Sequence, residues 1–370
     1  GAAGAPRAPT ARGARQALGP GGDPQSRRRR STLGDAAACA AAVASALARP
    51  RVARAESSLE APPKDDRQKR LLLGDPDVEE IRRVQRGLKL YDVRKGRFVP
   101  LTDLLRPGEP LYDADVVCIG ELHDSLADHT VQRLILDALT YRLFLDLRKE
   151  QGVDPAETKG VVSQNASPKR ITLGVEYFSR TQQPALDDYV FVNKGTTLDD
   201  FRKVVDWDNV WRYDWGLYAP TFRFCKLNGT KIIGMNLPFE VSLQVSRNGL
   251  ASLPDWLREA LPEVDLSKAK HRRRFEDMLR IPLEEAATRM ALPIGDFKPS
   301  PALDSYYESQ ALWDDYMADT ASKYLLGRGD GRLVVLAGVN HCWRDAIPDR
   351  LEAKSAKAGK PLRGGAAGAP

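Results

Sequence analysis

The sequence lacks the short motifs that identify several common classes of enzyme. It contains no HExxH, no GxSxG and no GxxxxGK[ST], and no apolar run is followed by GxGxxG. Each of these patterns fixes catalytic or phosphate-binding groups at a set spacing on a turn or helix. Their absence leaves zincin proteases, nucleophile-elbow serine hydrolases, P-loop enzymes and dinucleotide-binding enzymes without support.

Cysteine is scarce, and long apolar runs are absent. The four cysteines, Cys39, Cys118, Cys225 and Cys342, show no CxxC spacing. Cys118 lies within a predicted strand and Cys342 beside a histidine, so we expect buried thiols rather than disulfides or metal ligands. No run reaches the roughly 18 consecutive apolar residues that a membrane-spanning helix needs, so we expect no transmembrane segment.

The chain also lacks a basic body, although its formal charge is +6. The first 55 residues contain ten Arg, no Lys and two Asp, a charge of +8, while the remaining residues together carry −2. A nucleic-acid-binding domain needs a basic surface to neutralise phosphates. We therefore expect no nucleic-acid partner for the body of the protein.

Residues 1–55 have the composition of a targeting leader. Gly1–Ser26 is rich in Ala, Arg, Gly and Pro, as organelle transit peptides are. Arg27–Gly34, the Ala-rich residues 36–48 and an Ala-Arg-Ala sequence at 53–55 then follow the order of a signal's basic region, apolar region and cleavage site. This two-part pattern predicts a chloroplast transit peptide followed by a thylakoid-lumen signal. The alternative is a disordered tail rich in Arg and Ala.

Four apolar runs that end in polar residues are the main feature of the body. They are Val116–Ile119, Ile171–Glu176, Lys231–Asn236 and Arg332–Gly338. Runs of this length predict buried parallel strands, whose carboxyl ends meet at one edge of a sheet. We therefore expect a cleft at this edge. Its expected lining is Glu121, His123, Glu176, Asn236 and His341.

The spacing of the other segments predicts an α/β fold with a mainly parallel central sheet flanked by helices. Residues 56–86 read as a linker with a short helix, residues 87–351 as the α/β domain, and residues 352–370 as a disordered tail. Residues 88–105 predict a β-hairpin followed by a short helix. Residues 239–331 contain no further apolar run typical of a strand, and their pattern predicts a helical insertion between the third and fourth core strands.

The polar residues at the strand ends suit two kinds of chemistry. Glu121, His123, Glu176 and His341 together supply two carboxylates and two imidazoles, as general acid–base catalysis or a divalent metal requires. His129 lies near the start of the helix after the first strand and can lean toward the same place. Alternatively, the two imidazoles are hydrogen-bonded structural residues that close the end of the sheet. His271 lies in a charged helical segment, so we expect it to face solvent.

Six motifs, in order along the chain, carry a resemblance to a known family. They are IGELHDSLADHTVQ (119–132), GVEYFSRTQQPALDDY (174–189), YDWGLYAP (213–220), GMNLP (234–238), YYESQALWDDYMA (306–318) and LAGVNHCWRDAIPDRL (336–351). Together they resemble the ChaN-like family of haem-binding, iron-regulated lipoproteins. The larger group that contains this family also includes the Tiki proteases and the erythromycin esterases.

The resemblance implies haem or a related tetrapyrrole as ligand, bound through Tyr at a surface that forms dimers, and so it leaves a homodimer open. The cofactor-binding candidates are Tyr306, Tyr307, His123, His129, Asn236 and His341. One departure from the family is Asn340, which precedes the last His where relatives often carry Gly. The leader also carries no Cys of the lipoprotein type before its expected cleavage site.

From these observations we expect a plastid protein that binds haem or another tetrapyrrole for storage, transfer or scavenging, with a role in iron homeostasis. The alternative is a hydrolase, with Glu121, His123, Glu176 and His341 as catalytic residues or as ligands of a divalent metal. A third option is an enzyme scaffold without activity that binds a partner.

Overall fold

The computed structural model describes residues 78–152, 171–289, 301–327, 331–363 and 366–367. The expected leader at 1–55 lies outside these residues. The chain falls into two compact units, Gly1–Ser57 with Asp277–Ile294, and Ser58–Glu276 with Gly295–Pro370. Residues 277–289 are the described part of the first unit, and they form the end of one helix. The second unit contains the sheets and the candidate site.

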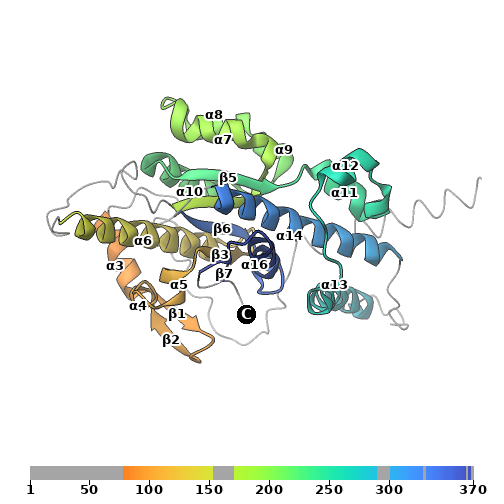
Figure 1. Cartoon of the computed structure of the whole chain (residues 1–370), viewed down its shortest axis with the longest axis horizontal. Coiled ribbons are helices and arrows are strands. Elements are labelled where there is room, and N and C mark those ends of the chain that lie inside the picture. The colour runs from red at the N-terminus through yellow and green to blue at the C-terminus, as the bar shows by residue number, and fades with distance from the viewer. Residues whose placement is uncertain (1–77, 153–170, 290–300, 328–330, 364–365, 368–370) are drawn as a thin grey trace, which may run out of the picture. The chain divides into compact units, whose positions relative to one another are not determined.

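A hairpin precedes the main sheet. It follows helix α3 (Val78–Gly87) and consists of β1 (Lys89–Asp92) and β2 (Arg97–Pro100), which pair antiparallel as a separate two-stranded sheet. The prediction of a hairpin at this place is confirmed. The short helices α4 (Leu101–Leu104) and α5 (Pro110–Asp113) then lead into the main sheet (Figure 1).

The main sheet is parallel, with strand order β5-β4-β6-β3-β7. Its strands are β3 (Val116–Glu121), β4 (Ile171–Ser179), β5 (Lys231–Asn236), β6 (Arg332–Gly338) and β7 (Ala366–Ala367). The first four are the strands that the apolar runs predict. The fold class, α/β with a parallel sheet flanked by helices, is therefore confirmed.

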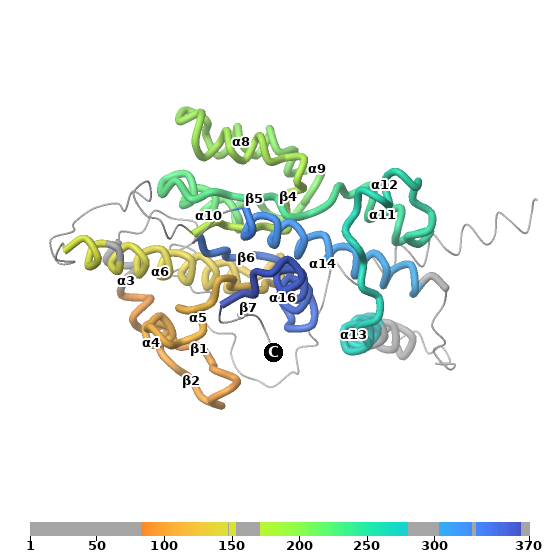
Figure 2. Tube along the Cα trace, viewed as in Figure 1, coloured from red at the N-terminus to blue at the C-terminus, as the bar shows by residue number. Residues whose placement is uncertain are grey.

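Helices connect the strands and cover both faces of the sheet (Figures 1 and 2). Helix α6 (Leu126–Glu150) follows β3, and α10 (Trp215–Asn228) precedes β5. Shorter helical turns lie between β4 and α10: η3 (Arg180–Gln182), α7 (Gln183–Asp187), η4 (Asp188–Val192), α8 (Leu198–Val204) and α9 (Trp207–Val210). Between β5 and β6 lie α11 (Phe239–Asn248), η5 (Leu250–Ser252), α12 (Asp255–Ala260), α13 (Ala269–Arg289) and α14 (Pro301–Gly327). The expected helical insertion between the third and fourth core strands is present.

Alternation along β6 explains why the sheet has two buried faces. Val334 and Leu336 belong to one core with residues of α6 and α10, whereas Leu333 and Val335 belong to another with residues of α14. Neighbouring side chains of a strand point to opposite faces, so a strand that is apolar throughout needs helices on both sides. The described part of the chain contains no helix that is long and apolar enough to cross a membrane.

The tail differs from the expectation of disorder from residue 352. After β6, the chain forms α15 (Val339–Cys342) and α16 (Ile347–Lys357), and β7 then pairs with Val116 and Val117 of β3. Leu351 is fully buried and Ser355 nearly so. The Lys- and Ala-rich composition suggested disorder because only one face of α16 is buried. The pairing of β7 depends on its backbone, so composition does not predict it.

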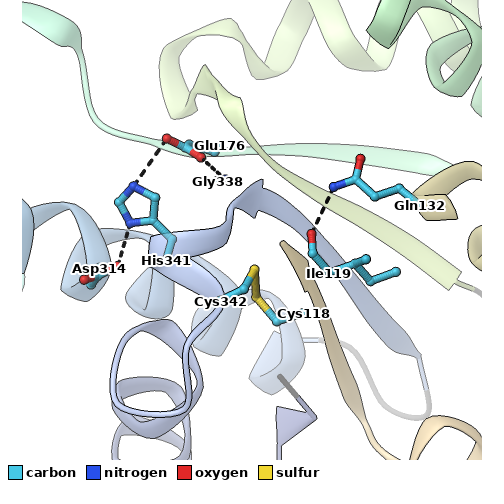
Figure 3. Close-up of a disulfide and its surroundings, with 8 residues drawn as sticks. All are labelled: Cys118, Ile119, Gln132, Glu176, Asp314, Gly338, His341 and Cys342. Carbon is cyan, nitrogen blue, oxygen red and sulfur yellow. Dashed lines mark hydrogen bonds and ion pairs between the residues drawn. A yellow bond between two sulfur atoms is a disulfide. The ribbon is translucent and has the colours of Figure 1, made fainter. Parts of the chain in front are cut away.

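The prediction of free buried thiols is wrong for two cysteines. Cys118 in β3 and Cys342 in α15 form a disulfide, with 5.5 Å between their Cα atoms and 224 residues between them in the chain (Figure 3). Cys225 is free and buried. The pairing arises because β3 neighbours β6, and α15 follows β6 directly. No sequence spacing announces such a contact.

We expect the Cys118–Cys342 disulfide to stabilise the fold, because it closes a very long loop in the unfolded chain. The Cys118→Ala/Cys342→Ala variant should lose about 2–4 kcal/mol of unfolding free energy. Denaturant titrations with and without a thiol reductant measure this. Reductant should destabilise the wild type and the Cys225→Ala control, but not the double variant. A wild type that is insensitive to reductant under conditions that reduce the bond would contradict the assignment.

Candidate functional site

The carboxyl ends of the strands bring the expected polar residues to one edge of the sheet. Glu121 is the last residue of β3, Glu176 lies in β4, Asn236 ends β5, and His341 lies in α15 immediately after β6. Since β6 lies between β3 and β4, the residues that follow it stand between the two glutamates.

Glu121 is a buried carboxylate that four side chains surround. The hydroxyl of Tyr218 donates to Oε1 at 3.1 Å, and the hydroxyl of Tyr177 donates to Oε2 at 3.5 Å. Nδ1 of His123 lies 3.0 Å from Oε1, and Nδ1 of His129 lies 3.5 Å from Oε2. A buried carboxylate with this many donors is held in one orientation.

The turn after β3 sets the position of His123. The N–H of Leu122 donates to Oδ2 of Asp128 at 2.8 Å, and the N–H of Asp128 donates to Oγ of Ser125 at 3.2 Å. Ser125 thus caps the first turn of α6, and Asp128 holds the N–H of Leu122 in the turn before the helix. The carbonyl oxygen of His123 lies 3.1 Å from the hydroxyl oxygen of Tyr218, so it shares the single O–H of this residue with Glu121.

His123 is the most exposed imidazole of the site, although it is still partly buried. Its side chain is 24% exposed, compared with 3% for His129, 2% for His271 and 6% for His341. Burial alone would lower the pKa of His123, but the hydrogen bond to Glu121 and the charge of Glu176 outweigh it and raise the pKa.

Two aromatic rings flank His123. The ring centroids of Trp211 and Tyr213 lie 4.9 Å and 4.8 Å from that of the imidazole. Arg212, between them, has φ = 66°, in the left-handed region. This conformation costs about 1 kcal/mol or more for a residue other than glycine. The surrounding structure therefore holds this turn in place, and with it the two rings.

Glu176, His341 and Asp314 form a second, deeply buried chain of charges (Figure 3). Nε2 of His341 lies 3.4 Å from Oε1 of Glu176, and Nδ1 lies 2.7 Å from Oδ1 of Asp314. The N–H of Gly338 donates to Oε2 of Glu176 at 2.6 Å. The imidazole of His341 thus bridges two carboxylates.

These contacts fix the charge states. Burial alone would lower the pKa of His341, but the two carboxylates raise it to about 10. Burial alone would raise the pKa of Glu176, but His341, His123 and the N–H of Gly338 lower it to about 2. The pKa of Asp314 is lowered too, against burial, by His341 and His271. At neutral pH, His341 is therefore an imidazolium between two carboxylates.

Gly338 joins the two clusters. A Cβ atom added to this residue would lie 3.0 Å from both Cε1 and Nε2 of His123 and 3.5 Å from Oε2 of Glu176. The imidazole edge of His123 therefore faces Gly338 and the Glu176 carboxylate. Four of the residues expected at the cleft, Glu121, His123, Glu176 and His341, are thus brought together.

The prediction that His271 faces solvent is wrong. His271 is buried, and its Nε2 lies 2.9 Å from Oδ2 of Asp314. Its Nδ1 lies 3.3 Å from the hydroxyl of Tyr307 and 3.3 Å from Nη2 of Arg350. The basic residues that surround His271 in the sequence conceal one buried position on the helix. His271 extends the chain of alternating imidazoles and carboxylates that starts at Glu176.

The remaining residues that the sequence suggested for the site are Asn236, His129, Tyr306 and Tyr307. Oδ1 of Asn236 accepts from the N–H of Leu237 at 2.8 Å. His129 is buried, and its Nε2 lies 3.3 Å from the carbonyl oxygen of His123. Tyr307 is buried in α14 against His271, whereas Tyr306, its neighbour, is half-buried.

The divalent-metal alternative finds no support. Within the described ranges, no group of three or more His, Cys, Asp or Glu side chains can hold a metal ion. The charge states give the reason, because both nitrogen atoms of His341 face carboxylates and carry protons, whereas a metal ligand needs a free lone pair.

Sequence reasoning missed Asp314, Tyr218, Trp211 and Tyr213 as parts of the site. Asp314 is fully buried between Leu312 and Met317 of α14, which are also fully buried. A charged residue among apolar residues of one helix is a signal for a buried carboxylate with a partner. For Tyr218, Trp211 and Tyr213, the density of aromatic residues in this segment indicated only that they pack in the core.

Comparison with known proteins decides the family. The family model described as haem-binding uptake, Tiki superfamily, ChaN matches residues 109–351, more than half of the chain. The chain belongs to the ChaN family. The resemblance that the six motifs carry is thereby confirmed. No curated protein matches the sequence of this ChaN-family chain.

Solved structures show distant likenesses. ChaN of Campylobacter jejuni, whose structure is described as binding haem cofacially, is 19% identical with a TM-score of 0.48, and the alignment covers 74% of this chain and 88% of that one. An erythromycin esterase mutant in its open conformation is 15% identical with a TM-score of 0.30, covering 74% and 67%. A Bacillus cereus protein is 14% identical with a TM-score of 0.30, covering 77% and 73%. Because the sequence identities and TM-scores are this low, the family assignment rests on the family model alone.

The charge chain of this ChaN-family protein predicts how stability depends on pH. The pKa of His341 is raised from 6.5 to about 10, so its proton stabilises the folded state fully below pH 6.5, and this contribution is lost as the pH rises to about 10. The pKa of Glu176 is lowered from 4.5 to about 2, so its contribution is lost as the pH falls through this range.

Histidine-labelled NMR measures the first half of this prediction. The chain has four histidines, so the imidazole spectrum contains few signals. We expect one imidazole, absent in His341→Gln, to stay protonated well above pH 7, with the free energy of unfolding falling above that pH. A neutral His341 at pH 7 would contradict the assigned charge state.

Proposed function

We propose that this chain binds haem or a related tetrapyrrole at the strand-end site, with His123 as the ligand of the iron. Membership of the haem-binding ChaN family supports the ligand class. The observation that carries the residue assignment is exposure, since His123 is partly exposed and the other three imidazoles are buried.

The surroundings of His123 suit an iron ligand. Its Nδ1 faces the buried carboxylate of Glu121, and an imidazole that donates from Nδ1 keeps its lone pair on Nε2. A carboxylate behind a ligating imidazole fixes the ring and strengthens it as a donor. The edge of the ring that carries Nε2 lies against Gly338, which has no side chain, so iron reaches Nε2 once this contact opens. Trp211 and Tyr213 supply aromatic faces beside it.

The two tyrosines of α14 fit the role less well. The hydroxyl of Tyr307 is buried against His271, so iron would have to open the core to reach it. Tyr306 is half-buried and stays a second candidate ligand. Bound haem would supply an iron centre that can be stored, passed on or scavenged. In a homodimer, each haem would be bound by one chain or shared between two.

A haemin titration of the full chain, followed in the Soret region, tests the proposal. We expect saturation in the wild type and at least about tenfold weaker binding in His123→Ala, because the direct bond to iron is lost. Glu121→Gln should weaken binding less, by removing the carboxylate behind the ring. Since protons compete for Nε2 of His123, wild-type binding should strengthen as the pH rises through the range in which His123 titrates.

Two tyrosine variants provide the controls. Tyr307→Phe keeps the buried ring and should bind haemin like the wild type, and Tyr306→Phe decides the second candidate. Saturable binding that is equal in the wild type and in His123→Ala would remove His123 as ligand. The absence of any saturable shift would remove haem binding itself.

A second candidate function is hydrolysis by acid–base chemistry. The specific observation is that the imidazole of His123 lies between Glu121 and Glu176, and both carboxylates raise its pKa. A Glu–His pair of this kind can take a proton from water that attacks an ester or lactone. Glu176→Gln separates the two functions, because it should abolish hydrolysis in an ester screen while leaving the Soret shift in place.

We also propose that the chain works in a plastid, in the thylakoid lumen. The Arg- and Ala-rich composition of residues 1–55 supports this, and a disulfide between Cys118 and Cys342 suits an oxidising compartment. Import of the labelled chain into isolated chloroplasts, with two successive cleavages, is the expected result. A chain that remains uncleaved outside the organelle would contradict it.

A further inference from the structure

The β1–β2 hairpin presents an apolar surface to solvent. Tyr91 of β1 stands opposite Phe98 of β2, and their ring centroids are 5.2 Å apart. Tyr91 is 53% exposed, Phe98 67% and Val93, in the turn, 56%. Three large apolar side chains gathered at the end of one small hairpin are more than the scattered exposure that soluble surfaces show.

The opposite face of the hairpin holds it to the body of the protein. Leu90 pairs with Val99, which is buried, and both lie on the side of the strands away from Tyr91 and Phe98. Leu90 and the fully buried Leu101 belong to the core that includes residues of α6. The inner face is thus anchored, while the aromatic pair has its full outer face available.

The hairpin and the helix before it are rich in basic residues. Residues 83–98 contain six basic side chains and one acidic one: Arg83, Arg86, Lys89, Arg94, Lys95 and Arg97 against Asp92. Within the described residues, Lys95 pairs with Glu109 and Asp92, and Arg94 pairs with Asp92. No carboxylate of the described chain pairs with Lys89 or Arg97, which are exposed. This local excess contrasts with the net charge of −2 beyond residue 55.

An anionic lipid membrane is the partner that matches both properties at once. Aromatic rings settle at the level of the headgroups, and flanking Lys and Arg attract the negative charge of the surface. A nucleic acid or another polyanion would use the charges but would leave Val93 and the aromatic pair without an apolar partner.

We propose that the outer face of the β1–β2 hairpin docks this protein on an anionic lipid membrane. Tyr91, Val93 and Phe98 enter the interface between headgroups and acyl chains, and Lys89, on the same face as Tyr91, and Arg94, in the turn, contact the headgroups. The hairpin is a separate two-stranded sheet, so docking leaves the main sheet and the strand-end site unchanged. The proposal is independent of the ligand bound at His123.

Co-sedimentation of the full chain with vesicles tests the surface. The vesicles contain either phosphatidylcholine alone or equal amounts of phosphatidylcholine and phosphatidylglycerol. The basic leader is present in every variant, so the differences between variants report on the hairpin. The test variants are Tyr91→Ser/Phe98→Ser and Lys89→Glu/Arg94→Glu. The matched control, Trp256→Ser/Leu227→Ser, replaces two side chains that are 71% and 67% exposed elsewhere.

We expect each hairpin variant to lower the partition coefficient on anionic vesicles about tenfold, as the loss of two interfacial rings or the reversal of two charges implies. The control should stay within about twofold of the wild type. All variants should keep the wild-type melting temperature, because the replaced side chains are exposed.

Two outcomes overturn the proposal. One is an aromatic variant that binds anionic vesicles as the wild type does. The other is a loss of heparin binding on replacement of Tyr91 and Phe98 that is as large as the loss of vesicle binding. The surface would then serve a polyanionic or protein partner.

Discussion

The pairing of β6 with β3 on one side and β4 on the other is the constraint on which the site depends. Glu121 pairs in register with Gly338, and Val175, next to Glu176, pairs with Leu336. Both glutamates therefore reach the same edge on either side of β6. Because Gly338 has no side chain, the ring of His123 fits beside it, at a place where a Cβ atom would be 3.0 Å from the ring.

The charges at this edge stabilise one another and separate the site into two parts. Glu176, His341 and Asp314 alternate in sign within the core, and each buried charge depends on its neighbours. Removal of one partner from such a pair typically costs about 3–5 kcal/mol, because the other charge stays buried without compensation. This part of the site is consequently rigid and closed. The other part of the site is Glu121 and His123, which are joined by a hydrogen bond. His123 is the residue of the site that is most exposed to solvent.

The sequence predicted the strands and the residues at their ends, since apolar runs and the polar residues after them are local signals. It did not predict contacts that depend on packing between distant segments. His271 meets Asp314 across the helical insertion, and Cys118 meets Cys342 across 224 residues. Composition also misled at the tail, where Lys354 pairs with Asp315 on a helix that the basic sequence hides. Aromatic residues likewise gave no local sign that Trp211 and Tyr213 would flank His123.

The central claim is that the imidazole of His123 provides the protein's bond to haem iron. Pulsed electron paramagnetic resonance of the ferric complex, prepared with natural-abundance and with ¹⁵N-labelled histidine, tests it most directly. We expect a nitrogen coupling from the imidazole bound to iron that changes on labelling and disappears in His123→Ala. A spectrum that does not respond to the label, or a coupling that persists in His123→Ala, would contradict it.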